Sequence, residues 1–180
     1  MSLNGFLPEL SARIATLRRD LHAHPELAFE ETRTAAVVAE HLKRLGLEVH
    51  EGIAKTGVVA CLRAGNGTRA IGLRADMDAL PLPEMNTFPH HSRHPGRMHA
   101  CGHDGHTAML LGAAEALVRL KDAGGFDGTV HFIFQPAEEH EGGGRVMVEE
   151  GLFERFPMQM VFGLHNWPGL PVGSIAVHEG

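Results

Sequence analysis

Three things that the sequence lacks limit what the protein can be. Cysteine is scarce: the two residues present stand 40 positions apart, which argues against a disulfide framework and for a reducing compartment, the cytoplasm. No apolar run is long enough to cross a bilayer, and no basic segment followed by an apolar one opens the chain. Positively charged residues are also few: the chain has 16 Lys and Arg and 22 Asp and Glu, which gives a net charge of −6 with histidine neutral. We therefore expect neither nucleic acid nor a membrane as a partner.

Histidine is the residue type in excess. Six of the 14 histidines lie between His90 and His106, so the excess is local, which favours a functional origin over a compositional one. The rest of the composition is ordinary for a globular protein: 43% of the 180 residues are hydrophobic, which suffices for one sizeable core in one domain.

The hydrophobic pattern alternates between the helical and the extended period. Apolar residues at helical spacing predict helices over 8–22, 31–45 and 104–121 and a short helix over 145–150. Strands are predicted over 47–50, 57–63, 70–75, 129–135 and 160–164; we expect the first three to form a meander and 129–135, which is largely apolar, to be central. Cys61, in the second strand, is expected to be a buried core thiol. The pattern predicts an α/β fold with a site along one sheet edge.

The segment 98–106 concentrates potential metal ligands. It contains one thiol, three imidazoles and a carboxylate, and thiolate and imidazole are the ligands that borderline-soft divalent metals prefer. In an extended segment Cys101 and His103 leave the same face. His106 follows three residues later and lies on the same side if a helix begins there. The segment therefore predicts half of a transition-metal site.

Further polar groups follow the predicted strands. Asp76 and Asp78 come directly after 70–75, and three roles are open for them: metal ligands, carboxylates that accept a ring N–H from a ligating histidine, or ordinary turn residues. Glu138 and Glu139 follow the central strand, where a turn can direct both carboxylates into one cavity, one to bind metal and one to accept a proton. An exposed acidic turn is the alternative. His165 ends the strand 160–164.

Five segments in this order resemble those of one enzyme family. They are His-Ala-His-Pro-Glu-Leu at 22–27, Arg-Ala-Asp-Met-Asp-Ala-Leu at 74–80, Met-His-Ala-Cys-Gly-His-Asp-Gly-His at 98–106, Phe-Gln-Pro-Ala-Glu-Glu at 134–139 and Leu-His at 164–165. They look like the motifs of the metal-dependent amidohydrolases related to hippurate hydrolase, N-acyl-amino-acid amidohydrolases and plant auxin-conjugate hydrolases. The resemblance covers the chain from about residue 7 to its end.

The resemblance implies an aminoacylase-like catalytic domain, a three-layer sandwich of helices around a mixed sheet, with two divalent ions of zinc, manganese, nickel or cobalt. It implies that Glu138 is the general base and that four residues bind metal: Cys101, His103, Glu139 and His165. The cations would lower the pKa of a bound water, and Glu138 would take its proton and return it to the leaving amine of a small N-acyl amino acid. The roles of Asp104 and His106 stay open between support of the ligands and contact with substrate.

Members of the family are about twice this long, with a lid domain that mediates dimerisation and a second catalytic half that brings a further histidine ligand. The resemblance implies that 1–180 is the N-terminal part of the catalytic domain, that 173–177 is the last strand before the lid, and that this piece alone is impaired. Two alternatives remain. One is a non-catalytic module in which Cys101, His103, His165 and a carboxylate close a structural zinc site; the other is a related deacetylase or dipeptidase. A structural site needs no free carboxylate beside it, so the Glu138–Glu139 pair favours catalysis.

Overall fold

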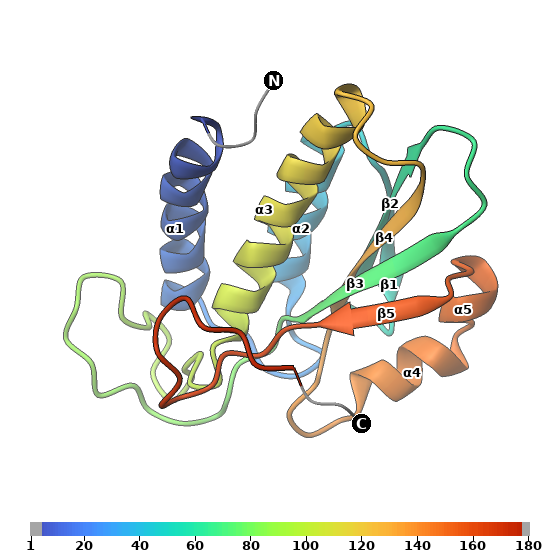
Figure 1. The fold of residues 1–180 in the computed structure, drawn as a ribbon. Coiled ribbons are helices and arrows are strands. Elements are labelled where there is room, and N and C mark those ends of the chain that lie inside the picture. Colours follow the sequence, from blue (N-terminus) through green and yellow to red (C-terminus); the bar gives the residue numbers. More distant parts are fainter. Residues whose placement is uncertain (1–4, 178–180) are drawn as a thin grey trace.

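A mixed five-stranded sheet forms the middle layer of the computed structural model, which describes residues 5–177 (Figure 1). The strands are β1 (Glu48–Ile53), β2 (Gly57–Ala64), β3 (Ala70–Asp76), β4 (Gly128–Gln135) and β5 (Met160–Gly163). Their order across the sheet is β1-β2-β4-β3-β5. The pairs β1–β2 and β2–β4 are antiparallel, whereas β3 runs parallel to both β4 and β5. The prediction of an α/β fold is confirmed.

Three long helices lie over one face of the sheet and two short ones over the other (Figure 1). The long helices are α1 (Leu7–Ala23), α2 (Thr32–Arg44) and α3 (His103–Asp122), and the short ones are α4 (Gly143–Glu149) and α5 (Leu152–Arg155). The bounds of α1 to α4 lie within two residues of those that the periodicity predicts. The sequence did not predict α5, because four residues are too few for a helical period to be visible. None of these helices, among the described residues, is long and apolar enough to span a membrane.

Two apolar clusters hold the layers together, one on each face of the sheet. The larger joins α2 and α3 to the sheet through side chains such as Leu42, Leu111 and Phe132, none of them exposed. The smaller packs Ile133 of β4 against Met147 and Phe156 on the opposite face. Successive residues of a strand point to opposite faces, so β4 supplies both clusters. This confirms the prediction that 129–135 is a central strand.

The prediction of a meander is wrong for its second half. Strand β3 does not pair with β2, because β4 lies between them and pairs with both. The chain reaches β4 from β3 through α3, the helical crossover that a parallel pair requires. A strand apolar enough to be covered on both faces is more stable in the middle of the sheet than at its edge, and this position excludes the simple hairpin order.

Two further predictions need correction. Residues 173–177 do not form a strand: no described strand lies beside them, and Ile175 and Val177 are 79% and 85% exposed. Cys61 is partly rather than fully buried, and its Sγ lies 3.2 Å from Nδ1 of His131, its cross-strand neighbour. Both cysteines are free thiols, as the sequence predicted.

Because β3, β4 and β5 are mutually parallel, their carboxyl ends meet at one edge of the sheet, and α3 begins at the same edge (Figure 1). The segments that follow these strands carry Asp76 and Asp78, Glu138 and Glu139, and His165, respectively. The fold therefore brings together groups that are far apart in the sequence.

Candidate metal centre

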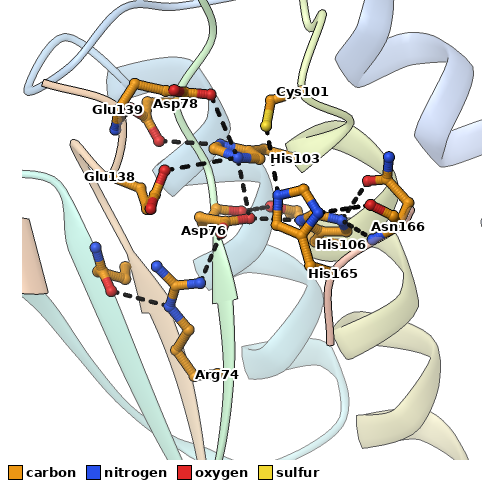
Figure 2. A network of polar contacts seen from close by, with 12 residues as sticks. Arg74, Asp76, Asp78, Cys101, His103, His106, Glu138, Glu139, His165 and Asn166 are labelled. Atoms are coloured by element: carbon orange, nitrogen blue, oxygen red, sulfur yellow. Dashed lines mark hydrogen bonds and ion pairs between the residues drawn. The ribbon is translucent and has the colours of Figure 1, made fainter. Parts of the chain in front are cut away.

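The predicted ligands converge on one buried histidine (Figure 2). Three sets of side chains have ligand atoms within 4.8 Å of one another, and His103 belongs to each: Cys101, His103 and His165; His103, Glu138 and Glu139; Asp76, His103 and His106. The four ligands that the resemblance implies and the implied base thus lie around a single imidazole. Each of the three parallel strands and the start of α3 contributes to the group.

The orientation of His103 leaves one ring nitrogen free for a cation. Its Nδ1 lies 3.1 Å from Oδ1 of Asp78, while Nε2, although buried, has no hydrogen-bond partner among the described residues. Oε1 of Glu139 is likewise buried without a partner, and it lies 3.7 Å from this Nε2. Each buried polar atom without a partner destabilises the fold by roughly 1–3 kcal/mol. A cation that accepts both lone pairs would remove this penalty, so the residues fit a metal ion.

Cys101 and His165 face each other across the group. The Cys101 Sγ lies 3.4 Å from His165 Nε2, and Nδ1 of His165 donates to the backbone oxygen of Asn166 at 2.7 Å. Burial, and then the carboxylates of Glu139, Asp76 and Glu138, raise the pKa of the Cys101 thiol to about 12. A thiol in such surroundings ionises only when a cation balances the carboxylates, and metal binding does this. The donor set and its excess of negative charge therefore suit a divalent transition metal.

Asp78 holds the two sides of the centre together. One carboxylate oxygen contacts His103, and the other accepts the backbone N–H of Glu139 at 3.0 Å. Burial alone would raise the pKa of Asp78, but the hydrogen bonds from His103 and from the backbone of Glu139 and Glu138 outweigh it and lower the pKa. Of the three roles left open for Asp78, the geometry favours the carboxylate that orients a histidine.

Asp76 does the same for His106. Its Oδ1 lies 2.7 Å from His106 Nδ1, and its Oδ2 accepts from Arg74 at 2.6 Å. Burial would raise the pKa of Asp76, but the His106 hydrogen bond and the charges of His103 and Arg74 outweigh it and lower the pKa to about 2. Asp76 Oδ1 also lies 3.7 Å from the free Nε2 of His103. The geometry leaves Asp76 both the orienting role and the ligand role, and excludes an exposed turn residue.

Asn166, which sequence reasoning did not single out, connects two parts of the site. Its backbone N–H donates to His106 Nε2 at 3.1 Å, and its side-chain Oδ1 lies 2.6 Å from the same nitrogen. The amide also covers Gly102, where a Cβ would come within 2.4 Å of Oδ1, and Gly102 has a φ of +91°. Only glycine suits this position between Cys101 and His103. Gly102 was the one feature of the sequence that could have indicated a close neighbour at this point.

Asp104 belongs to none of the ligand sets and contacts α1 instead. Its Oδ2 lies 2.8 Å from Nδ1 of His22 and 2.7 Å from Nε of Arg18, both on α1. His22 also contacts Glu84 through Nε2 at 3.1 Å. Burial would raise the pKa of Asp104, but the hydrogen bond with His22 and the nearby charges lower it. Of the two roles left open for Asp104, support of the ligands fits this geometry, because Asp104 anchors α1 to the first turn of α3.

An open cluster of nitrogen, sulfur and oxygen ligands with a further carboxylate beside it is the arrangement found in metal-dependent hydrolases. Comparison with known proteins gives the family. The signature of peptidase family M20/M25/M40 matches residues 72–180, and the chain belongs to this family.

Named relatives agree with the resemblance found in the sequence. Hippurate hydrolase from Campylobacter jejuni is 49% identical over 168 residues, which are 93% of this chain and 43% of that protein. N-acyl-L-amino acid amidohydrolase from Geobacillus stearothermophilus is 44% identical over 99% of this chain and 47% of that protein. The Bacillus subtilis YXEP protein, described as a dinuclear metal binding peptidase from the M20 family, superposes with a TM-score of 0.89 at 42% identity, over 96% of this chain and 48% of its own. The chain thus spans less than half the length of each of these relatives.

Proposed function

We propose that the chain is the metal-binding part of a hydrolase that cleaves the amide bond of small N-acyl amino acids of the hippurate type. The names of the relatives support the substrate class, and the dinuclear relative supports two divalent ions, which we expect to be zinc, manganese, nickel or cobalt. The single observation that carries the proposal is the pairing of Glu138 with Glu139 beside the free Nε2 of His103.

The two glutamates differ in a way that suits different tasks. Glu139 is mostly buried, with its Oε1 directed at His103 and its backbone N–H held by Asp78. The Glu138 side chain is 41% exposed, and its Oε2 lies 4.0 Å from His103 Nε2. We assign Glu139 to the metal together with Cys101 and His103, and His165 as the fourth ligand. Glu138 stays unbound and accessible.

The bound cations would supply an acidified water and a Lewis acid for the amide carbonyl. The Glu138 carboxylate takes a proton from the attacking water and returns it to the leaving nitrogen, so that the products are a carboxylate and a free amino acid. Asp78 keeps the His103 Nδ1 proton in place, which leaves the Nε2 lone pair directed at the centre. Asp76 and Asn166 fix His106 and with it the segment that carries His165.

We further propose that residues 1–180 act together with a second catalytic half and a lid domain, which in the whole protein would supply a further histidine ligand and a dimer contact. Two observations support this. The relatives are about twice as long, and the last described strand, β5, is exposed along its length, with Phe162 52% and Met160 61% exposed. Exposed apolar strands at a sheet edge usually have a partner.

The test is metal content and hydrolysis of hippurate and other N-acyl amino acids, for this chain and for a form extended through the proposed second half. Glu138→Gln in the extended form should abolish turnover and retain metal, because the amide cannot accept the proton. Glu141→Gln, an exposed glutamate in the same turn, is the matched control and should remain active. Full activity of Glu138→Gln would contradict the assignment of the base. A single tightly held ion without turnover in either form would instead favour the structural zinc module, for which Cys101, His103 and His165 form the three-ligand set.

A further inference from the structure

The end of α1 and its connection to α2 contribute no side chain to the three ligand sets, yet they contact three of the four segments that carry these sets. Nδ1 of His22 lies 2.8 Å from Asp104, the residue after His103. The backbone oxygen of Glu26 accepts from the N–H of Ala79, the residue after Asp78, at 2.8 Å. The Glu31 carboxylate accepts from the N–H of Ala137, the residue before Glu138, at 2.8 Å. Figure 1 shows this connection at the end of the sheet where β3 stops and α3 begins.

Glu31 is the most unusual of these contacts, because a carboxylate is seldom fully buried. The residue is 0% exposed, and burial raises the pKa of its carboxyl group. Its Oε1 accepts from Ala137 and its Oε2 from the Thr56 hydroxyl at 2.5 Å. A buried carboxylate is retained at a cost in stability, and neither partner here is a cation that would offset that cost.

The Glu31 carboxylate contacts the backbone at Ala137, a residue in an unfavourable conformation. Ala137 has a φ of +53°, a left-handed conformation that is unfavourable for a residue with a Cβ. Residues keep such conformations only when their surroundings hold them there. The loop is held on one side by Glu31 at Ala137 and on the other by Asp78 at Glu139. Of the two carboxylates proposed for the chemistry, Glu138 lies between these anchors and Glu139 is anchored through its own N–H.

We propose that Glu31 is a positioning residue that holds Ala137 in its left-handed conformation and thereby directs Glu138 and Glu139 at the metal centre. This inference rests on the proposed function, which assigns Glu138 and Glu139 their tasks at the metal centre. The contact itself does not depend on hydrolysis. If the Glu31 acceptor is lost, Ala137 is free to return to a negative φ, and the two following side chains then turn away from His103.

The first test uses the metal-free chain and measures backbone amide exchange by NMR. Glu31→Ala should increase the exchange rate of the Ala137 amide by about 10-fold or more relative to the Phe134 amide of β4 in the same sample. Glu31→Gln keeps one oxygen acceptor for the Ala137 N–H, and its NH₂ can donate to the Thr56 hydroxyl, which can also accept, so this variant should remain close to wild type. Glu31→Asp keeps the charge but is one methylene shorter, and it should behave like Glu31→Ala. If Glu31→Ala is recovered unfolded, Glu31→Asp carries the test.

The second test measures Co²⁺ affinity and the cobalt d–d absorption bands of the same variants. Loss of a residue that orients metal ligands typically weakens metal affinity by ~10–100-fold. Glu31→Ala and Glu31→Asp should therefore weaken Co²⁺ binding by about 10-fold and shift the absorption bands. Glu31→Gln should keep both the affinity and the bands of the wild type. Val38→Ala, in the buried core of α2, the helix that follows Glu31, controls for general destabilisation.

Wild-type exchange at Ala137 in Glu31→Asp, wild-type Co²⁺ binding in that variant, or equal effects in Val38→Ala would each overturn the proposal. Neither readout involves turnover. A chain that binds cobalt and responds to Glu31 as expected but hydrolyses no N-acyl amino acid would therefore refute the proposed function and leave the positioning role intact.

Discussion

Replacing Asp78 with asparagine tests how the histidine and the glutamate of the centre are held. The carboxylate serves two N–H donors at once, His103 Nδ1 at 3.1 Å and the Glu139 backbone N–H at 3.0 Å. An amide has only one oxygen, so one of the two donors must lose its acceptor or the His103 ring must change tautomer. Asp78 is 1% exposed, and water cannot easily replace the lost acceptor.

The substitution should lower both the stability and the metal affinity of the chain, and each loss has its own assay. One unsatisfied buried donor should lower the free energy of unfolding of the metal-free chain by about 1–3 kcal/mol, as measured by urea denaturation in a chelator. Because a tautomer change would place the proton on Nε2, affinity for Zn²⁺ or Co²⁺ should also fall by about 10–100-fold, which corresponds to about 1.4–2.7 kcal/mol. Asp122→Asn, exposed at the end of α3, is the control and should change neither quantity. An Asp78→Asn chain with wild-type stability and wild-type metal affinity would refute the reasoning.

Three further outcomes are expected. Gly102→Ala should weaken metal binding and lower stability by about 1–3 kcal/mol, because φ is +91° and the new Cβ would lie 2.4 Å from Asn166 Oδ1; an unchanged denaturation midpoint would count against the packing described. The folded-state pKa of Asp76, about 2 against an ordinary 3.8, lies below its unfolded value. The contribution of Asp76 to the free energy of unfolding, about 2 kcal/mol, is thus present above pH 3.8 and lost as pH falls towards 2. The free energy of unfolding of the metal-free chain should fall with pH over this range, and Asp76→Asn should lack this dependence. The pKa of Cys61, raised to about 11 from 9.0 chiefly by burial, implies alkylation by iodoacetamide about 100-fold slower than in the unfolded chain, and mass spectrometry showing equal rates would contradict this.

Local pattern was enough to predict helices α1 to α4 and the described strands, because an amphipathic period is visible in neighbouring residues. The order of the sheet was not predictable in this way. Strand β4 separates β2 from β3, and its place depends on pairing with both of these strands, which lie far away in the sequence. The segment 173–177 has the composition of a strand but no described neighbour to pair with, and composition alone could not reveal that.

The candidate ligands were predictable from residue type and from their positions after strands, and the structure brings all of them together around His103. The residues that orient them were harder to identify. Glu31 and Asn166 look ordinary in the sequence, because their significance lies in contacts with Ala137 and His106, 106 and 60 residues away. For Asp78, the option of a histidine partner could be stated from the sequence, but choosing among the options required coordinates.

The central claim is that a thiol, two imidazoles and a carboxylate from separate segments bind the same metal centre. The most direct measurement is anomalous diffraction at the zinc edge from crystals of the chain grown with Zn²⁺. We expect the strongest anomalous peaks within bonding distance of Cys101 Sγ, His103 Nε2, Glu139 Oε1 and His165 Nε2. Peaks elsewhere on the surface, with no density between these four atoms at saturating zinc, would contradict the account.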